Sequence, residues 1–268
     1  MDKITNFNST LSNKYDDLKH IYLNLHQDLN RKEIAMIFSD DFLKSLNNWQ
    51  NGWGDNQTLR NNFAIELLKN CKDLPAKYKK ITVPCFRKRF LHKEELLAII
   101  MADDKDEGVV SWTTDEKYAE RFKGLLKANA VSGAIFKINP EYENVVVNVV
   151  NLWSDEEFVR SVEDYAKREP ENTKALLHFK ANQSEVILKS HLRGSDIISL
   201  TGLASPFDIL CDQAGIADEI RDDIFKKLID NGEYINEPSY TPPGSAQAVL
   251  SRVIEKFNKR IIELSQAT

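Results

Sequence analysis

The sequence predicts an α+β fold, from three observations on where its apolar residues fall. Apolar residues recur at helical spacing over the first 75 or so residues and again from Pro206 onward. Between these segments lie short β-branched runs bounded by Asn, Gly and Pro, which are typical of strands. We therefore expect a helical N-terminal region over 1–78, a mixed core over 79–203 and a helical C-terminal extension over 204–268.

The first region is expected to form helices from residue 14 to about residue 75. The apolar stripes contain Tyr15, Leu18, Ile21, Tyr22, Leu25 and Leu29; then Ile34, Ile37, Phe38, Phe42 and Leu46; then Leu59, Phe63, Leu67 and Leu68. The Asn- and Gly-rich segment 47–57 predicts a loop, which Trp49 and Trp53 would anchor on the core. Pro75 ends the third helix.

The core and the extension alternate short strands with helices. Strands are expected over 81–87, 109–113, 133–138, 145–150, 185–188 and 197–200, with an acidic loop over 103–108 and a loop or short strand over 176–179. Thr114 is the expected N-cap of one helix, and Ser154 with Glu157 predicts a capping box for another. Two more helices follow Pro206, separated by a Pro-, Gly- and Tyr-rich loop over 237–245.

Composition narrows the class of protein. The net charge of −5 creates no global attraction to nucleic acid or to an anionic membrane. The three cysteines are widely spaced, which fits a reducing compartment, and the five scattered histidines have no zinc-ligand spacing. The N-terminus lacks the apolar stretch of a signal peptide, and no apolar run approaches the length of a membrane span. We expect a cytoplasmic protein with no metal and no membrane partner.

The stretch 182–188 places polar groups at the start of an apolar strand. Strand alternation would put Gln183 and Glu185 on one face, so that an amide and a carboxylate lie side by side. Taken alone, Glu185 reads as a solvated strand end. Two other stretches precede it in the core: Phe86-Arg87, and Ser111-Trp112-Thr113-Thr114-Asp115 followed by Ala119 and Phe122.

These three stretches, in this order, resemble the arginine–serine–glutamate branch of the mono-ADP-ribosyltransferases, toxin-like enzymes that use NAD as donor. The resemblance covers about the middle half of the chain. It implies a mainly antiparallel core of two sheets with flanking helices, an NAD co-substrate and no metal. It also implies transfer of a single ADP-ribose to a macromolecule.

The resemblance assigns roles to individual residues. Arg87, with Phe86 beside it, would bind the NAD phosphates and nearby ribose, since a planar guanidinium suits bidentate phosphate contacts. Ser111, supported by Thr113, would hold the nicotinamide ribose and the catalytic glutamate. Glu185 would stabilise the positive charge that develops on the ribose as the glycosidic bond breaks. The alternative for Arg87 is a structural ion pair with a local carboxylate.

Two positions, Gln183 and Phe179, bear on the identity of the acceptor. Family members with glutamate at the Gln183 position modify arginine, whereas glutamine fits a neutral amide or a nucleobase edge. Phe179 lies where the family has its acceptor-recognition loop and could stack on a base, or it could be ordinary core. The expected acceptor is an RNA or DNA base or a protein Asn or Gln. Gln183, Phe179 and the basic residues around Arg87 together slightly favour the base, and the acidic net charge opposes it.

The sequence departs from the family pattern in two places. Lys88 stands where glycine usually follows the arginine, and it either disturbs the donor site or adds a phosphate-binding cation. No phosphate–nicotinamide loop is identifiable after Ala128. The helical ends suggest a possible inhibitory partner protein. Two other functions remain open: an NAD glycohydrolase, and an inactive NAD-binding or interaction module.

Overall fold

The chain divides into two compact units, each built from two stretches of sequence. The computed structural model describes residues 37–203, 210–211, 213–233 and 238–266. Of these, the helical unit takes the residues up to Ala76 and Asn151–Lys180, and the sheet unit takes Lys77–Val150 and the residues from Ala181 onward. The sequence suggested three consecutive regions. The two units divide the chain differently, because residues 151–180 group with the N-terminal helices and the C-terminal residues group with the sheet.

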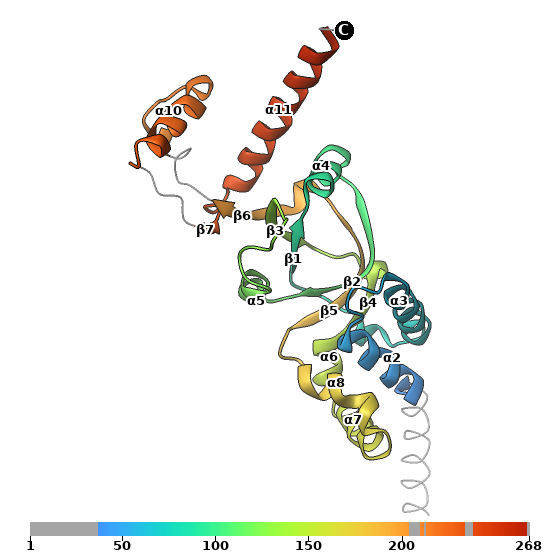
Figure 1. Cartoon of the computed structure of the whole chain (residues 1–268). Coiled ribbons are helices and arrows are strands. Elements are labelled where there is room, and N and C mark those ends of the chain that lie inside the picture. The colour runs from blue at the N-terminus through green and yellow to red at the C-terminus, as the bar shows by residue number, and fades with distance from the viewer. Residues whose placement is uncertain (1–36, 204–209, 212, 234–237, 267–268) are drawn as a thin grey trace, which may run out of the picture. The chain divides into compact units, whose positions relative to one another are not determined.

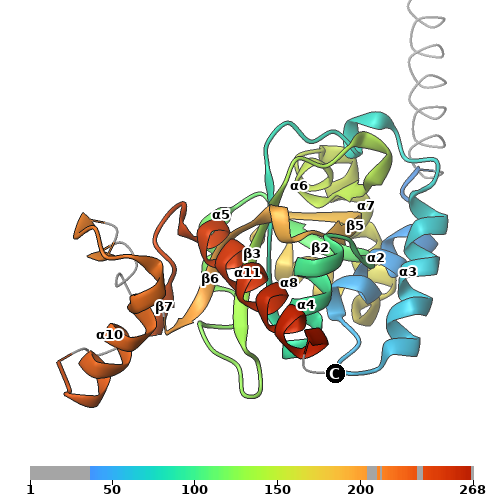
Figure 2. The same ribbon diagram turned by 90° about the horizontal axis from the view of Figure 1, so that it is seen from above.

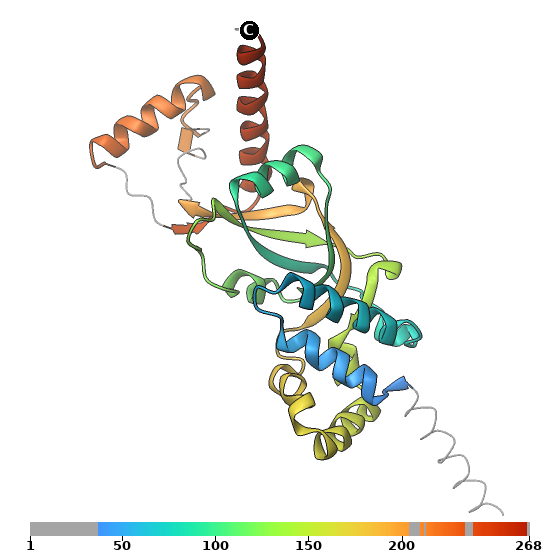
Figure 3. The same ribbon diagram turned by 45° about the vertical axis from the view of Figure 1, so that its right-hand side comes forward.

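The helical unit packs short helices around aromatic side chains. Its helices are α2 (Asp40–Asn51), α3 (Gln57–Cys71), α7 (Glu156–Arg168) and α8 (Lys174–Phe179), and α6 (Val149–Trp153) spans the boundary in sequence (Figure 1). The rings of Phe38 and Phe42 both lie edge-on to Phe158, with centroids 5.3 and 6.5 Å away. Figure 3 shows α2 in blue beside the yellow helices α7 and α8.

Two segments of the helical unit differ from the sequence-based expectation. The expected loop over 47–57 is helical as far as Asn51, where Gly52 ends α2 with a φ of 82°. Residues 176–179 lie in helix α8, neither a loop nor a strand. Both differences involve Asn47, which is 5% exposed and whose Oδ1 accepts from the amides of Ala175 and Leu176 at 3.0 and 3.4 Å.

Smaller differences from the expectation concern one helix cap and the position of Trp49. Asp155, not Ser154, caps α7, and its side chain accepts from the amide of Glu157. Trp49 is buried within α2, and its ring lies 5.0 Å from Trp53 in the shorter loop that follows. The expected stripe from Tyr15 to Leu29 lies outside the described residues.

The sheet unit is mixed α+β, as expected, with an antiparallel seven-stranded sheet. The strands are β1 (Cys85–Leu91), β2 (Lys105–Thr113), β3 (Ser132–Ile138), β4 (Val145–Asn148), β5 (Glu185–Leu192), β6 (Ile197–Leu203) and β7 (Pro238–Tyr240). Their order in the sheet is β4-β5-β2-β1-β3-β6-β7. Strand β1 begins four residues later than the expected strand over 81–87, and β2 begins inside the expected acidic loop, with a bulge between Asp106 and Gly108.

The strands on either side of the β1–β2 boundary are paired along long ladders, but β1 and β2 themselves are paired only at one end. Strand β2 pairs with β5 from Lys105 to Thr113, and β1 pairs with β3 along its whole length. Between β1 and β2 the register consists of Phe86 opposite Thr113. The two strands therefore meet at one end, and side chains rather than a main-chain ladder occupy the rest of their boundary.

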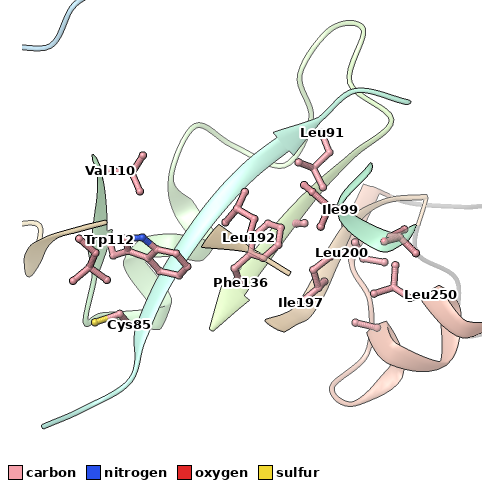
Figure 4. Close-up of a cluster of buried hydrophobic side chains, with 14 of the residues drawn as sticks. Cys85, Leu91, Ile99, Val110, Trp112, Phe136, Leu192, Ile197, Leu200 and Leu250 are labelled. Atoms are coloured by element: carbon pink, nitrogen blue, oxygen red, sulfur yellow. The ribbon is translucent and has the colours of Figure 1, made fainter. Parts of the chain in front are cut away.

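One apolar cluster holds the sheet unit together. Figure 4 shows side chains from several strands meeting those of α4 (Lys93–Ala102) and α11 (Ser245–Gln266). The buried members include Leu91, Ile99, Trp112, Phe136, Leu192, Ile197 and Leu250. Helices α4 and α11 contact each other over this cluster, as the view in Figure 2 shows. The core depends on the C-terminal segment because Ala246 and Leu250 of α11 are part of it.

The C-terminal residues add one element that the sequence did not indicate. Strand β7 lies in the expected loop over 237–245 and pairs Tyr240 with Thr201 of β6. Helix α10 (Asp218–Asp230) is the first of the two helices expected after Pro206, and it ends just before Gly232, which has a φ of 69°. Among the described residues, no helix combines the length and apolarity needed to cross a bilayer.

Candidate functional site

A hollow of about 80 Å³ lies where β1 and β2 meet, and it collects most of the residues singled out by the sequence. Strand β1, strand β2, the segment around helix α5 (Glu116–Arg121) and the start of β5 supply its walls. The lining residues are Phe86, Arg87, Lys88, Ser111, Trp112, Thr113, Tyr118, Ala119, Phe122, Gln183 and Glu185. All of them belong to the sheet unit.

The hollow brings together Arg87, Ser111 and Glu185 because of how the strands pair. Thr113 lies opposite Glu185 in the antiparallel β2–β5 ladder, so Ser111 is a diagonal neighbour of Glu185 on the same face. Arg87 follows Phe86, which is the β1 residue paired with Thr113. Three side chains far apart in sequence thus reach one place through two strand pairings.

Ser111 and Glu185 are directly bonded. The Ser111 hydroxyl donates to Glu185 Oε1 at 2.6 Å, a length typical of a charge-assisted O–H···O⁻ bond. Glu185 is 5% exposed, so this carboxylate is held in a largely desolvated setting. The serine therefore orients Glu185 within the hollow.

Arg87 bridges the strand boundary with its side chain. Its Nη1 donates to the main-chain carbonyl of Ser111 at 2.6 Å, and its Nη2 lies 3.6 Å from the Glu107 carboxylate. The Glu107 side chain is 6% exposed and also lies 3.3 Å from Arg89 and 3.8 Å from Lys105. The structural alternative considered for Arg87, a local ion pair, is thus present. The same contacts fix the guanidinium at the rim of the hollow.

Gln183 lines the hollow for a different reason from the one expected. Strand β5 begins at Glu185, and Ser184 has a φ of 47°, so strand alternation does not extend back to Gln183. The turn is held by β2 instead: the Thr113 hydroxyl donates to the Gln183 carbonyl at 2.7 Å, and the Thr114 amide to the Ser184 carbonyl at 3.0 Å. Gln183 and Glu185 still line the same hollow.

Aromatic side chains form the apolar part of the hollow. Phe86 and Trp112 come from the strands, and Tyr118 and Phe122 come from α5 and its C-cap, with ring centroids 6.0 Å apart. Burial raises the pKa of Tyr118, and the nearby Glu185 carboxylate raises it further. Asp115, one residue after the expected Thr114, caps α5 by accepting from the Tyr118 amide at 3.1 Å. The sequence pattern did not predict a role for Tyr118, because α5 is too short to show a full helical period.

Lys88 does not provide a cation for a bound phosphate. The residue is 6% exposed, and its ammonium donates to the carbonyls of Glu120 and Gly124 and to the Tyr240 hydroxyl. An ammonium has three hydrogens, so these three acceptors use all of them. Burial lowers the pKa of Lys88.

Phe179 is not among the residues that line this hollow. It ends α8 in the helical unit, where its half-buried ring meets His178 edge-on at a centroid distance of 4.7 Å. The described residues contain no group of three or more His, Cys, Asp or Glu placed to hold a metal ion. Comparisons with models of protein families, with curated proteins and with solved structures found no match.

Proposed function

We propose that the chain is a mono-ADP-ribosyltransferase, which transfers a single ADP-ribose from NAD to a macromolecular acceptor. The observation that carries this proposal is the Ser111–Glu185 hydrogen bond inside a hollow that Arg87 also lines. These are the three residues that the resemblance to the arginine–serine–glutamate enzymes assigned to the NAD site. They come from three different strands, and nothing in a simple strand pattern requires them to meet.

The chemistry asks for a fixed negative charge beside the ribose. When the bond between nicotinamide and ribose breaks, positive charge develops on the sugar, and an oriented carboxylate stabilises it selectively. Glu185 is suited to that role because it is buried and Ser111 sets its orientation. A carboxylate held in place needs little reorganisation during the reaction, which is the main source of electrostatic catalysis.

The lining of the hollow also fits one end of NAD. Its volume is well below the roughly 300–1,000 Å³ of pockets that enclose a whole ligand, so it could receive only one end of NAD. Phe86, Tyr118 and Phe122 offer apolar faces to a planar nicotinamide ring. The Arg87 side chain is 19% exposed at the rim, where it could meet a phosphate.

The acceptor side favours a neutral group over an arginine. Gln183 lines the hollow beside Glu185, and its amide can both donate to and accept from a nucleobase edge or a protein amide. The basic residues near Arg87 add less support for nucleic acid than their number suggests. Lys88 is bonded internally, and Arg89 lies 3.1 Å from Glu95 and 3.3 Å from Glu107. Gln183 therefore supports a neutral acceptor, and digestion of the labelled product must distinguish a nucleobase from a protein amide.

The proposal is tested with NAD labelled on its adenylate. Wild-type protein incubated with labelled NAD and cell lysate is expected to label a polymer, and separate nuclease and protease digestion identifies the acceptor class. Glu185→Gln should lower the rate of nicotinamide release at least about 100-fold. The matched control is Glu143→Gln, which alters an exposed glutamate of the same unit.

Each outcome discriminates among the functions considered. Free ADP-ribose with no labelled polymer would identify a glycohydrolase. No release of nicotinamide by the wild-type protein at high concentration would refute the enzymatic proposal. Equal rates for Glu185→Gln and wild type would refute the site.

A further inference from the structure

A hydrogen-bond cluster around the buried Lys88 ties the C-terminal segment to one wall of the hollow. Lys88 Nζ donates to the Glu120 carbonyl at 3.0 Å and to the Tyr240 hydroxyl at 2.6 Å, and it also reaches the Gly124 carbonyl. The Tyr240 hydroxyl in turn donates to the Glu120 carbonyl. We refer to Lys88 and Tyr240, with the two carbonyls that they hold, as the latch.

The latch joins three elements that are distant in sequence. Lys88 lies on β1, and Tyr240 lies on β7, which is 152 residues away. The carbonyls belong to Glu120 in α5 and to Gly124 in the turn after it. The Lys88 ammonium also lies 5.0 Å from the centre of the Tyr240 ring and 5.4 Å from that of Phe90.

Each hydrogen of the Lys88 ammonium has its own acceptor in the latch. A buried ammonium is tolerated only when its hydrogens are matched by acceptors, and here three acceptors meet three hydrogens. Burial raises the pKa of Tyr240 to about 12, so its hydroxyl stays protonated at neutral pH, whereas burial lowers the pKa of Lys88 and makes its ammonium depend on these three acceptors. Loss of the Tyr240 hydroxyl would leave one ammonium hydrogen without its acceptor.

The segment that the latch holds is a wall of the hollow. Tyr118 and Ala119 of α5 and Phe122 at its C-cap all line it, and the held carbonyls lie on either side of Phe122. A helix of six residues has little stability of its own. Asp115 secures its start, and the latch secures its end.

We propose that Lys88 and Tyr240 are positioning residues for the NAD site, so that the C-terminal segment sets the shape of the hollow through β7. This inference rests on the proposed function for the identity of the ligand. Lys88 stands where the enzymes that the chain resembles have glycine. In this chain it would hold the end of α5. This role also makes the residues after 203 part of the site's construction and not an appendage to it.

The test uses the full-length protein with Tyr240→Phe and Lys88→Met. Tyr240→Phe keeps the ring but removes the hydroxyl, and we expect KM for NAD to rise roughly tenfold while kcat changes less than about threefold. Lys88→Met should have a larger effect on KM, and Lys88→Arg, which can still donate to carbonyls, should recover part of it. Tyr142→Phe, at an exposed tyrosine of the same unit, is the matched control.

Amide hydrogen exchange supplies a readout that does not need catalysis. The amides of Phe122 and Gly124, which bond to the carbonyls of Tyr118 and Arg121, should exchange faster in Tyr240→Phe than in Tyr142→Phe. Faster exchange with an unchanged KM would overturn the positioning role, as would unchanged exchange. A wild-type protein that neither binds nor consumes NAD would refute the proposed function, and the exchange data would still decide whether the latch holds the wall.

Discussion

Ser111→Ala tests how much the orientation of Glu185 contributes to activity. The change removes a 2.6 Å bond to a carboxylate that is 5% exposed. Hydrogen bonds to charged groups contribute about 1.5–3 kcal/mol, and the short length and burial place this one within that range. Only stabilisation that is greater in the transition state than in the free protein changes kcat/KM, so this energy sets an upper bound of roughly 10- to 150-fold on the loss of kcat/KM for NAD, at about 1.36 kcal/mol per factor of ten.

The assay is initial-rate release of nicotinamide, measured beside a thermal melt of each variant. Ser111→Thr is the matched control, because threonine keeps the hydroxyl and suits a strand. We expect it to retain most of the wild-type rate. An alanine variant that stays folded and loses less than about threefold in kcat/KM would refute the role given to Ser111, because so small a change is under 1 kcal/mol.

Two further predictions concern stability. Asn47→Ala deprives the buried amides of Ala175 and Leu176 of their acceptor, so the free energy of unfolding by urea should fall by about 1–3 kcal/mol, with no fall expected for a control at exposed Asn61. Gly133→Ala places a Cβ 2.5 Å from Thr201 Oγ1, which must shift away from its bond with the Gly133 amide. We expect a loss of about 1–3 kcal/mol, and an unchanged melting temperature would contradict the close approach.

The resemblance predicted that Arg87, Ser111 and Glu185 meet, although a simple strand pattern does not require it. The segments around Ser111 and Glu185 are both rich in β-formers, and the β2–β5 ladder places the two residues diagonally on one face. The order of the motifs indicated which residues belong to the site. The β2–β5 ladder explains why Ser111 contacts Glu185.

Gln183 lines the hollow beside Glu185, as predicted, but strand alternation is not the reason. Alternation assumes extended backbone, and Ser184 departs from it with a φ of 47°. What places Gln183 is a pair of hydrogen bonds, one from Thr113 at the end of β2 and one from Thr114, the residue that follows it. Bonds of this kind involve partners far away in sequence, so they leave no periodic signal.

Lys88 and helix α8 show the opposite limit. The sequence marks Lys88 as an unusual cation but cannot indicate that its acceptors come from α5 and β7. Residues 174–179 are too few to register as a helix, and Asn47, whose side chain meets the first amides of that helix, predicted a loop instead. In each instance a tertiary contact outweighs the local preference.

The interleaving of the two units has a consequence for synthesis on the ribosome. Asn47 in α2 reaches its partner Ala175 only after a further 128 residues are made, and Lys88 waits 152 residues for Tyr240. During that interval the apolar side of α2, which later packs on Phe158, has no cover from α7. Because domains fold as units when their last element emerges, the described part of the helical unit can close once Lys180 is made, while β2, β3 and β4 still await β5 and β6. A nascent chain halted before that point would present an uncovered aromatic surface to chaperones and proteases.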